Sequence, residues 1–258
     1  MTAMATTLVG FISHGAPTLA LAQDGAAAAL TAWGAALARP RAIVVVSAHW
    51  VAATPLTGVE RQAPLYYDFG GFPDELYRVE YPAPGAPDVA ARVRALTGAD
   101  SAPARPFDHG VWVPLSKLFP DAGVPVVQLA LPLAAGPAGW LALGRALAPL
   151  RDEDVLVLGS GGIVHNLRAL GRPGAAPPWA LAFDRWVEEV LAAGDPDALA
   201  GVLDAPGARQ AHPTVEHLAP LLVAAGAASV DGRLPPPRYP VTGWELGALG
   251  MRSVAWGG

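Results

Sequence analysis

The chain has 258 residues, 52 % of them hydrophobic, which is enough for one α/β domain with a substantial core. It contains no cysteine, so disulfides, iron–sulfur clusters, thiolate metal sites and cysteine nucleophiles are excluded, and any metal must have nitrogen or oxygen ligands. The net charge is −5 and the chain has no block of basic residues, which argues against nucleic acid as a partner.

Four short apolar segments predict buried strands, because their hydrophobic residues run on continuously and do not alternate with polar ones. Segments between and after them predict helices, several of them rich in alanine. The strands are expected over 7–13, 42–47, 124–131 and 154–159, and the helices near 24–38, 87–97, 111–119, 138–150, 178–194 and 214–225. This alternation is typical of an α/β fold, so we expect a single domain with a mainly parallel or mixed central sheet flanked by helices.

The remaining segments complete this outline. GWELGALGMRSVAW, residues 243–256, predicts a further strand at a sheet edge, and the proline-rich stretches 81–87 and 234–240 predict surface loops. The uncharged stretch 123–144 is interrupted by prolines, so it predicts a strand, a turn and a helix and no membrane span. Because the N-terminus lacks the basic residues of a secretory signal, we expect a cytoplasmic protein with no membrane partner.

Histidines occur at the ends of predicted strands. His14, His49 and His165 each fall at or just beyond such an end, and small residues flank each of them. Ligands of open α/β sheets bind outside the carboxyl ends of the strands, so these three imidazoles are expected to meet at one edge. Each alone fits an ordinary polar residue, but together they indicate a site, since neutral imidazole is the commonest metal ligand.

Two more segments carry histidines and allow two interpretations. In FDHGVWVPL, Asp108 could cap the following helix while His109 points to solvent. In AHPTVEHLAP, which holds His212 and His217, Glu216 suits the first turn of a helix. Helix formation leaves His217 unexplained, and the residues alone do not decide whether these histidines join the site.

The chain resembles the class III extradiol aromatic ring-opening dioxygenases of the LigB-like superfamily, in particular the small members of the DOPA 4,5-dioxygenase type. The matching stretches are SHGAPTLAL, RAIVVVSAHW, YDFGGFPDELYRVEYPAPGAP, FDHGVWVPL, PVVQLAL, GSGGIVHNL and PTVEHLAPLL, in this order from residue 13 to 222. The resemblance implies one catalytic domain over 1–258. It also implies an enzyme that opens the ring of a catechol-type aromatic diol with O2 to a muconic semialdehyde.

The same resemblance implies roles for five histidines. His14, His49 and His217 are implied to hold a divalent metal, Fe(II) in the active enzyme, with Zn(II) as a possible occupant. His165 is implied to be the acid–base residue over the substrate. His109 is implied to lie close by and to hydrogen-bond substrate or oxygen. Whether His165 also ligates the metal stays open.

Glu216 is an alternative third ligand, because non-haem Fe(II) oxygenases commonly use two histidines and one carboxylate. In a helix, adjacent residues point about 100° apart, so only one of Glu216 and His217 can face the metal. The pattern of the small enzymes favours His217, which leaves Glu216 as a charge at the helix start or as a partner of a ligand.

The stretch LYYDFGGFP is expected to help form the substrate pocket, with Tyr67, Asp68 and Phe69 as candidate substrate-binding residues. Trp50 is a fourth candidate because it follows a proposed ligand. The alternative is a loop anchored by buried aromatic residues with a glycine turn.

Two other functions fit a cluster of histidines. A zinc-dependent hydrolase would use three histidines and an open position to activate water. A non-enzymatic metal-binding protein on the same fold is the second alternative. The two additional histidines, His109 and His165, exceed what a structural zinc site needs, and no G-x-S-x-G motif is present. A homodimer is a further possibility.

Overall fold

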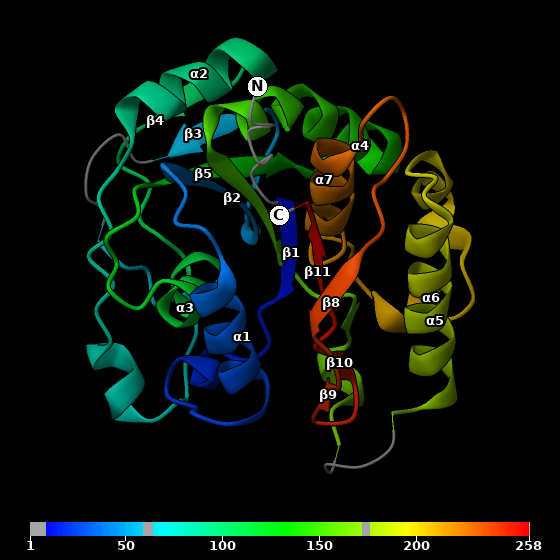
Figure 1. The fold of residues 1–258 in the computed structure, drawn as a ribbon. Helices are drawn as coiled ribbons and strands as arrows, with labels where there is room; N and C mark the ends of the chain where they lie inside the picture. The colour runs from blue at the N-terminus through cyan, green and yellow to red at the C-terminus, as the bar shows by residue number, and fades with distance from the viewer. Residues whose placement is uncertain (1–8, 59–63, 172–175, 258) are drawn as a thin grey trace.

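The four predicted apolar segments form the centre of an eight-stranded mixed sheet in the computed structural model, which describes residues 9–58, 64–171 and 176–257 (Figure 1). The strand order is β4-β3-β5-β2-β6-β1-β11-β8. The strands are β1 Val9–Ser13, β2 Ala42–Ala52, β3 Leu56–Gly58, β4 Asp100–Ala102, β5 Val126–Pro132, β6 Val155–Gly161, β8 Arg238–Val241 and β11 Ser253–Trp256. The central strands β5, β2, β6 and β1 are mutually parallel, whereas β11, β8 and β3 pair antiparallel, which confirms the predicted fold class.

Helices cover both faces of this sheet. They are α1 Gly25–Ala36, α2 Pro87–Thr97, α3 His109–Leu118, α4 Gly136–Leu147, α5 Pro178–Ala193, α6 Ala208–Ala211 and α7 Ala219–Ala228. Short 3₁₀ helices occupy Pro17–Ala20, Asp74–Arg78, Leu133–Ala135, Ala148–Glu153, Leu167–Ala169 and Asp197–Asp204. The buried residues of α1 and α3 pack on one face and those of α2, α4, α5 and α7 on the other.

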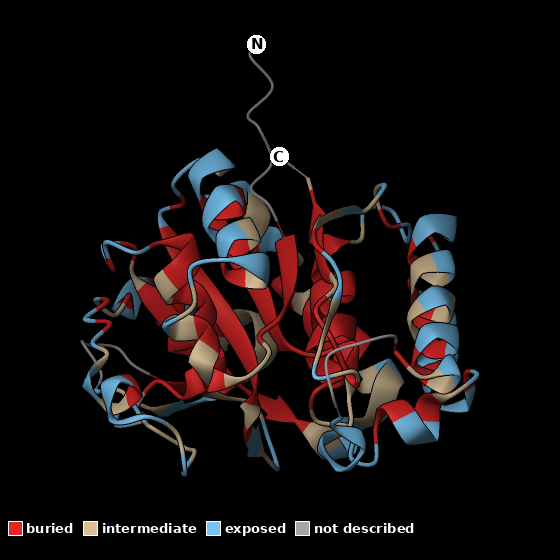
Figure 2. Cartoon of the chain, turned by 90° about the horizontal axis from the view of Figure 1, so that it is seen from below, coloured by how far each residue is buried: buried red, intermediate tan, exposed pale blue. Residues whose placement is uncertain are grey.

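Strand β2 shows why continuous apolar sequence forms the centre of this sheet. Ile43 and Val45 join the core under α1 and α3, while Val44 and Val46 join the core on the opposite face. Side chains alternate across a strand, so a strand buried on both faces must be apolar at every position. Figure 2 shows the resulting arrangement, with buried strands between helices whose outer faces are exposed.

A small second sheet lies beside the carboxyl ends of the parallel strands. It has the order β7-β10-β9 and consists of β7 Val164–His165, β9 Trp244–Glu245 and β10 Leu249–Gly250. Leu249 pairs with His165 on one side and with Glu245 on the other. The segment 243–256 therefore contains three strands, one of which, β11, lies inside the main sheet.

Several predicted boundaries are wrong. The stretch 234–240, predicted as a loop, contains the start of β8, which is the edge strand next to β11. The helix predicted to start at 214 starts at Ala219, and residues 213–218 form bends and turns. Strand β2 continues past residue 47 to Ala52, with an irregular register that affects the segment containing His49. Residues 7 and 8 of the first predicted strand lie outside the described residues.

Within the described ranges, none of the helices combines the length and apolar character that a membrane crossing requires.

Candidate active site

Five of the six histidines meet beyond the carboxyl ends of the parallel strands. His14 follows β1, His49 lies in the irregular part of β2, and His109 is the first residue of α3. His165 ends β7, and His217 lies in the turn before α7. The structure thus brings together all five predicted metal-binding and catalytic histidines.

The five imidazole rings form one contiguous group. The ring centroid of His14 lies 5.0 Å from that of His49, 5.4 Å from that of His109 and 5.4 Å from that of His217. The His49 ring lies 3.9 Å from His109 and 4.9 Å from His217. The His165 ring stacks on His217 at 3.5 Å with an angle of 5° between the planes.

The nitrogen atoms at the centre of this group fit a divalent metal ion. Among the described residues, the histidines whose nitrogens lie within 4.8 Å of one another are His14, His49 and His109, a set that contains His109 in place of the predicted ligand His217. The Nε2 atoms of His14 and His49 face each other at 3.2 Å. The Nε2 atom of His217 is buried without a hydrogen-bond partner among the described residues. A buried nitrogen without a partner is unfavourable unless a ligand completes it.

Hydrogen bonds at the opposite ring nitrogen orient two of these imidazoles. Ser160 Oγ donates to Gly110 O at 2.5 Å, so it must accept the hydrogen bond that joins it to His14 Nδ1 at 2.9 Å. His217 Nδ1 lies 3.1 Å from the Glu216 carboxylate, which can only accept. Both imidazoles therefore carry their proton on Nδ1 and leave the lone pair of Nε2 free for a metal.

Asp68 provides the corresponding Nδ1 contacts for His109 and His49. Its Oδ1 atom lies 2.9 Å from Nδ1 of His109 and accepts the backbone N–H of the same residue at 3.0 Å. Its Oδ2 atom lies 3.4 Å from Nδ1 of His49. Four imidazoles thus have an oxygen at Nδ1, which is the arrangement that turns Nε2 toward a shared ion.

Burial sets the charge of the site. Burial, followed by the charges of neighbouring imidazoles, lowers the pKa of His49 to about 2 and that of His165 to about 3, and it holds the pKa of His14 well below its ordinary value. The hydrogen bond from His217, opposed by burial, lowers the pKa of Glu216 to about 2. At neutral pH these three imidazoles are uncharged, which is the form that binds metals and accepts protons.

Gly161 allows two of these segments to approach each other. Its carbonyl accepts the backbone N–H of His14 at 3.0 Å, and the next residue, Gly162, donates to His217 O at 2.9 Å. A Cβ atom at Gly161 would lie only 2.1 Å from His217 O. The absence of a side chain at Gly161 therefore lets the turn that carries His217 lie directly on the end of β6.

The four predicted substrate-binding residues have distinct surroundings. Phe69 contacts the His109 ring edge-on at 5.7 Å between centroids, and Tyr67 packs against Phe69 while its hydroxyl donates to Val79 O at 2.8 Å. Trp50 is buried beneath the Arg105 guanidinium, whose Cζ lies 5.2 Å from the ring centroid. Asp68 contacts the histidines as described above. Of the four, Phe69 and Asp68 contact the histidine group directly.

Of the two interpretations of FDHGVWVPL, the one in which Asp108 caps α3 and His109 points to solvent is wrong, because the Asp108 side chain makes no capping hydrogen bond and His109 is buried. Asp108 is fully buried and instead accepts hydrogen bonds from Ser47, Gln128 and Arg105. Ser47 Oγ in turn accepts the backbone N–H of His49 at 3.2 Å. Sequence reasoning missed this network, although Asp108 next to a candidate histidine was a usable signal.

The structure changes the argument about whether Glu216 or His217 is the third metal ligand. Both precede α7, so the helical spacing used to separate them does not apply. The Glu216 carboxylate contacts Nδ1 of His217, which makes it a partner of that imidazole. The sixth histidine, His212, lies apart from the five rings in a buried position, and its Nε2 is 2.7 Å from Ile163 O.

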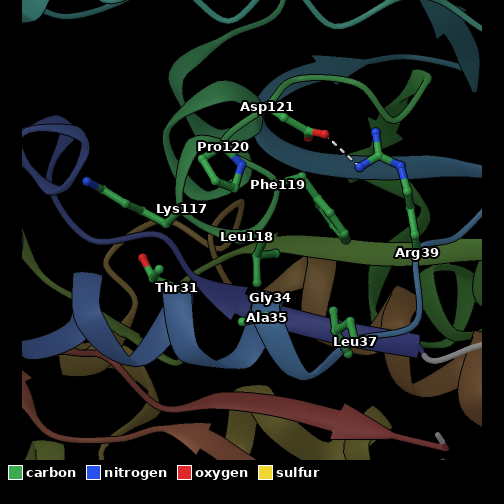
Figure 3. Close-up of a pocket in the computed structure, with 10 residues that line it drawn as sticks. All are labelled: Thr31, Gly34, Ala35, Leu37, Arg39, Lys117, Leu118, Phe119, Pro120 and Asp121. Atoms are coloured by element: carbon green, nitrogen blue, oxygen red, sulfur yellow. Dashed lines mark hydrogen bonds and ion pairs between the residues drawn. The ribbon is translucent and has the colours of Figure 1, made fainter.

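A hollow of about 290 Å³ lies between α1 and the C-terminal end of α3 (Figure 3). An ion pair of 2.7 Å between Arg39 and Asp121 lies at one side of it. Leu118, which lines it, is nine residues from His109, or roughly 13 Å along the helix. None of the described residues that line this hollow is a histidine, so it is separate from the imidazole group.

The chain is similar to proteins of one family in both sequence and structure. Residues 9–241 match the family described as the catalytic LigB subunit of aromatic ring-opening dioxygenase. The 4,5-DOPA dioxygenase extradiol of Escherichia coli (strain K12) is 41 % identical over 96 % of this chain and 93 % of its own length. That of Beta vulgaris is 38 % identical over 86 % and 87 %. The crystal structure of an uncharacterized protein from Escherichia coli K12 matches with a TM-score of 0.83 and 35 % identity, over 97 % of this chain and 100 % of that one.

Proposed function

The chain belongs to the LigB family of aromatic ring-opening dioxygenases and is an extradiol ring-cleaving dioxygenase, and from this premise we propose that it opens a catechol-type substrate with O2 to a muconic semialdehyde. The observation that carries this proposal is the group of five imidazoles, four of which have an oxygen at Nδ1. A divalent metal held by three of these imidazoles would still have coordination positions for a diol and for O2.

We assign the metal to His14, His49 and His217. The facing Nε2 atoms of His14 and His49 support this set, as does the buried Nε2 of His217, which has no partner in the part of the chain that the structure describes. The cation is Fe(II) in the active enzyme, and Zn(II) suits the same nitrogen ligands. When bound, Fe(II) would supply a Lewis acid that lowers the pKa of the diol and a path for electrons from the diol to O2.

His165 is the proposed acid–base residue. Its ring lies flat on that of His217, which places it beside the metal-binding group. Because burial lowers its pKa to about 3, it is neutral at pH 7 and can take the second phenolic proton of the diol at a ring nitrogen. The deprotonated substrate is negatively charged, and this charge raises the pKa of the His165 ring. The ring can therefore keep the proton until it is returned to the ring-opened product.

His109 is proposed to act on the substrate or oxygen from the other side of the group. Its Nδ1 is occupied by Asp68, so its Nε2 is the nitrogen available to the site. That atom can accept a hydrogen bond from a substrate hydroxyl.

The substrate pocket is proposed to include Phe69, Tyr67, Asp68 and Trp50. Phe69 contacts His109 edge-on, which gives a substrate ring an apolar surface next to the acid–base groups. The relatives from Escherichia coli and Beta vulgaris are named for cleavage of DOPA, so DOPA is the first catechol to test.

The decisive experiment is anaerobic reconstitution of metal-free protein with Fe(II), followed by oxygen and a panel of catechols that includes DOPA and protocatechuate. We expect oxygen uptake and a yellow ring-opened product that form only with Fe(II). Hydrolysis of an ester or amide by the Zn(II) form, without oxygen uptake by the Fe(II) form, would instead indicate a zinc hydrolase. Metal binding without either reaction would indicate a non-enzymatic protein.

A cytoplasmic location and a homodimer remain part of this proposal as expectations from the sequence. Cell fractionation and the mass of the protein in solution, measured by light scattering, test these two points.

A further inference from the structure

Asp68 lies between two imidazoles to which different tasks are assigned. Its Oδ1 atom is 2.9 Å from Nδ1 of His109, and its Oδ2 atom is 3.4 Å from Nδ1 of His49. The side chain is only 12 % exposed. One carboxylate thus contacts both a proposed metal ligand and a proposed substrate-facing residue.

The same carboxylate also holds the start of a helix. Oδ1 accepts the backbone N–H of His109, the first residue of α3, at 3.0 Å. The first N–H groups of a helix have no partner within it, and a negative charge there is stabilising. Asp68, from a loop 41 residues earlier, therefore supplies the cap that the neighbouring Asp108 does not supply.

The ionised form of Asp68 determines which nitrogen of each ring carries the proton. Each carboxylate oxygen of Asp68 faces the Nδ1 atom of an imidazole, and an aspartate carboxyl group is ordinarily ionised at neutral pH. An ionised carboxylate can only accept hydrogen bonds, so both facing Nδ1 atoms are favoured as donors.

Without Asp68, His49 could adopt the other tautomer, with its proton on Nε2. Its Nε2 lies 3.2 Å from Nε2 of His14, whose lone pair is free because Nδ1 of His14 donates to Ser160. In the metal-free protein, a proton on His49 Nε2 would form a hydrogen bond across this gap. That tautomer would occupy the nitrogen needed for the metal and would turn a lone pair of Nδ1 toward the Asp68 carboxylate.

We propose that Asp68 is a positioning residue that holds His49 and His109 in the Nδ1–H tautomer, and so keeps both Nε2 atoms free for the metal and the substrate. This inference rests on the proposed function for the tasks of the two histidines. Asp68 also affects the substrate pocket, because the next residue in the loop, Phe69, packs against the His109 ring. Asp68 therefore also ties an aromatic surface of the pocket to the histidine group.

The test is the isosteric variant Asp68→Asn. Its amide oxygen can still accept from His109, but its NH2 group then faces His49 and donates to Nδ1. We expect His49 to change to the Nε2–H tautomer, seen in ¹⁵N-histidine NMR spectra of the metal-free protein. Affinity for Co(II) or Zn(II), measured by titration against a competing chelator, should fall about 10- to 100-fold.

Asp184→Asn is the matched control. Asp184 is similarly buried, with 14 % of its side chain exposed, and its carboxylate forms an ion pair with Arg252 at 2.7 Å and not with an imidazole. It should leave the histidine tautomers and the metal affinity unchanged even if it lowers the melting temperature. Asp68→Glu, which restores a carboxylate, should recover part of the metal affinity.

An Asp68→Asn protein that is folded, keeps the parental tautomers of His49 and His109, and binds Co(II) within twofold of the parent overturns the inference. These measurements need no substrate. If the enzyme opens no catechol but Asp68→Asn changes the tautomer and weakens metal binding, the proposed reaction fails while the role of Asp68 stands.

Discussion

Replacement of Gly161 by alanine tests the contact between β6 and the turn that carries His217. The new Cβ would lie 2.1 Å from His217 O and 3.0 Å from the carbonyl carbon of the same residue. Contacts of a Cβ atom under 3.0 Å are essentially never seen, so the two backbones must separate by about 1 Å. The hydrogen bonds from His14 to Gly161 and from Gly162 to His217 must change with them.

The expected effect on the site is larger than the effect on folding. Overpacking of this kind costs about 1–3 kcal/mol of stability. A displacement of about 1 Å in a functional group can cost on the order of 100-fold in activity. We therefore expect Gly161→Ala to fold, to bind Zn(II) at least tenfold more weakly than the parent, and to lose most of its oxygen uptake with Fe(II).

Gly162→Ala is the control for this experiment. The nearest atom to its new Cβ would be Cβ of His165 at 3.5 Å, an ordinary van der Waals contact, and its φ angle is negative or extended. Both variants are purified without metal, checked by urea denaturation, and titrated with Zn(II) against a chelator. Equal Zn(II) affinities for Gly161→Ala, Gly162→Ala and the parent would refute the view that Gly161 positions the metal-binding histidines.

Three further predictions concern the roles of individual residues. His14→Ala should lose bound metal, whereas His165→Ala should keep it and lose turnover; elemental analysis and oxygen uptake separate the two, and undiminished metal in His14→Ala would contradict the ligand assignment. His212 is buried, one of its ring nitrogens has no hydrogen-bond partner among the described residues, and burial lowers its pKa from 6.5 to about 4. As the pH falls, His212 is protonated first in the unfolded chain, so the folded protein loses stability between pH 6.5 and 4. Urea denaturation of the metal-free protein should show that the parent loses about 2 kcal/mol more than His212→Gln between pH 7 and 5. Equal losses in the two proteins would contradict this. In Gly144→Ala the new Cβ would lie 2.0 Å from Val223 O, so α4 and α7 must separate. Alanine raises helix propensity by about 1 kcal/mol, but we expect the free energy of unfolding, measured by the same assay, to fall by about 1–3 kcal/mol. A more stable variant would show that the two helices adjust freely.

The sheet and the histidine group were predictable from sequence for the same physical reason. Strands buried on both faces must be continuously apolar, so a histidine directly after such a strand marks the edge at which the chain leaves the core. His14 follows this pattern, whereas His165 lies four residues after the end of β6 and is the last residue of the short strand β7. His49 differs in that β2 continues past it, because an irregular register between Val46 and Val51 replaces the end of the strand.

The contacts that orient the rings could not be predicted, since they join segments distant in sequence. Ser160 lies 146 residues from His14, and Asp68 lies 41 residues from His109. No local pattern marks a serine or aspartate for such a task. The late start of α7 has a similar origin, because the turn before it is held against β6 by the hydrogen bond from Gly162 to His217 O.

The position of the last strands has a consequence for the order of biosynthesis. Strand β1, which leads into His14, lies between β6 and β11, and His165 pairs with β10. Strands β10 and β11 both lie within the final ten residues of the described chain, and all six histidines precede them. A nascent polypeptide that still lacks β10 and β11 has every imidazole but not the strands that pair with β1 and with His165, so the histidine site should be completed only after these two strands have been added.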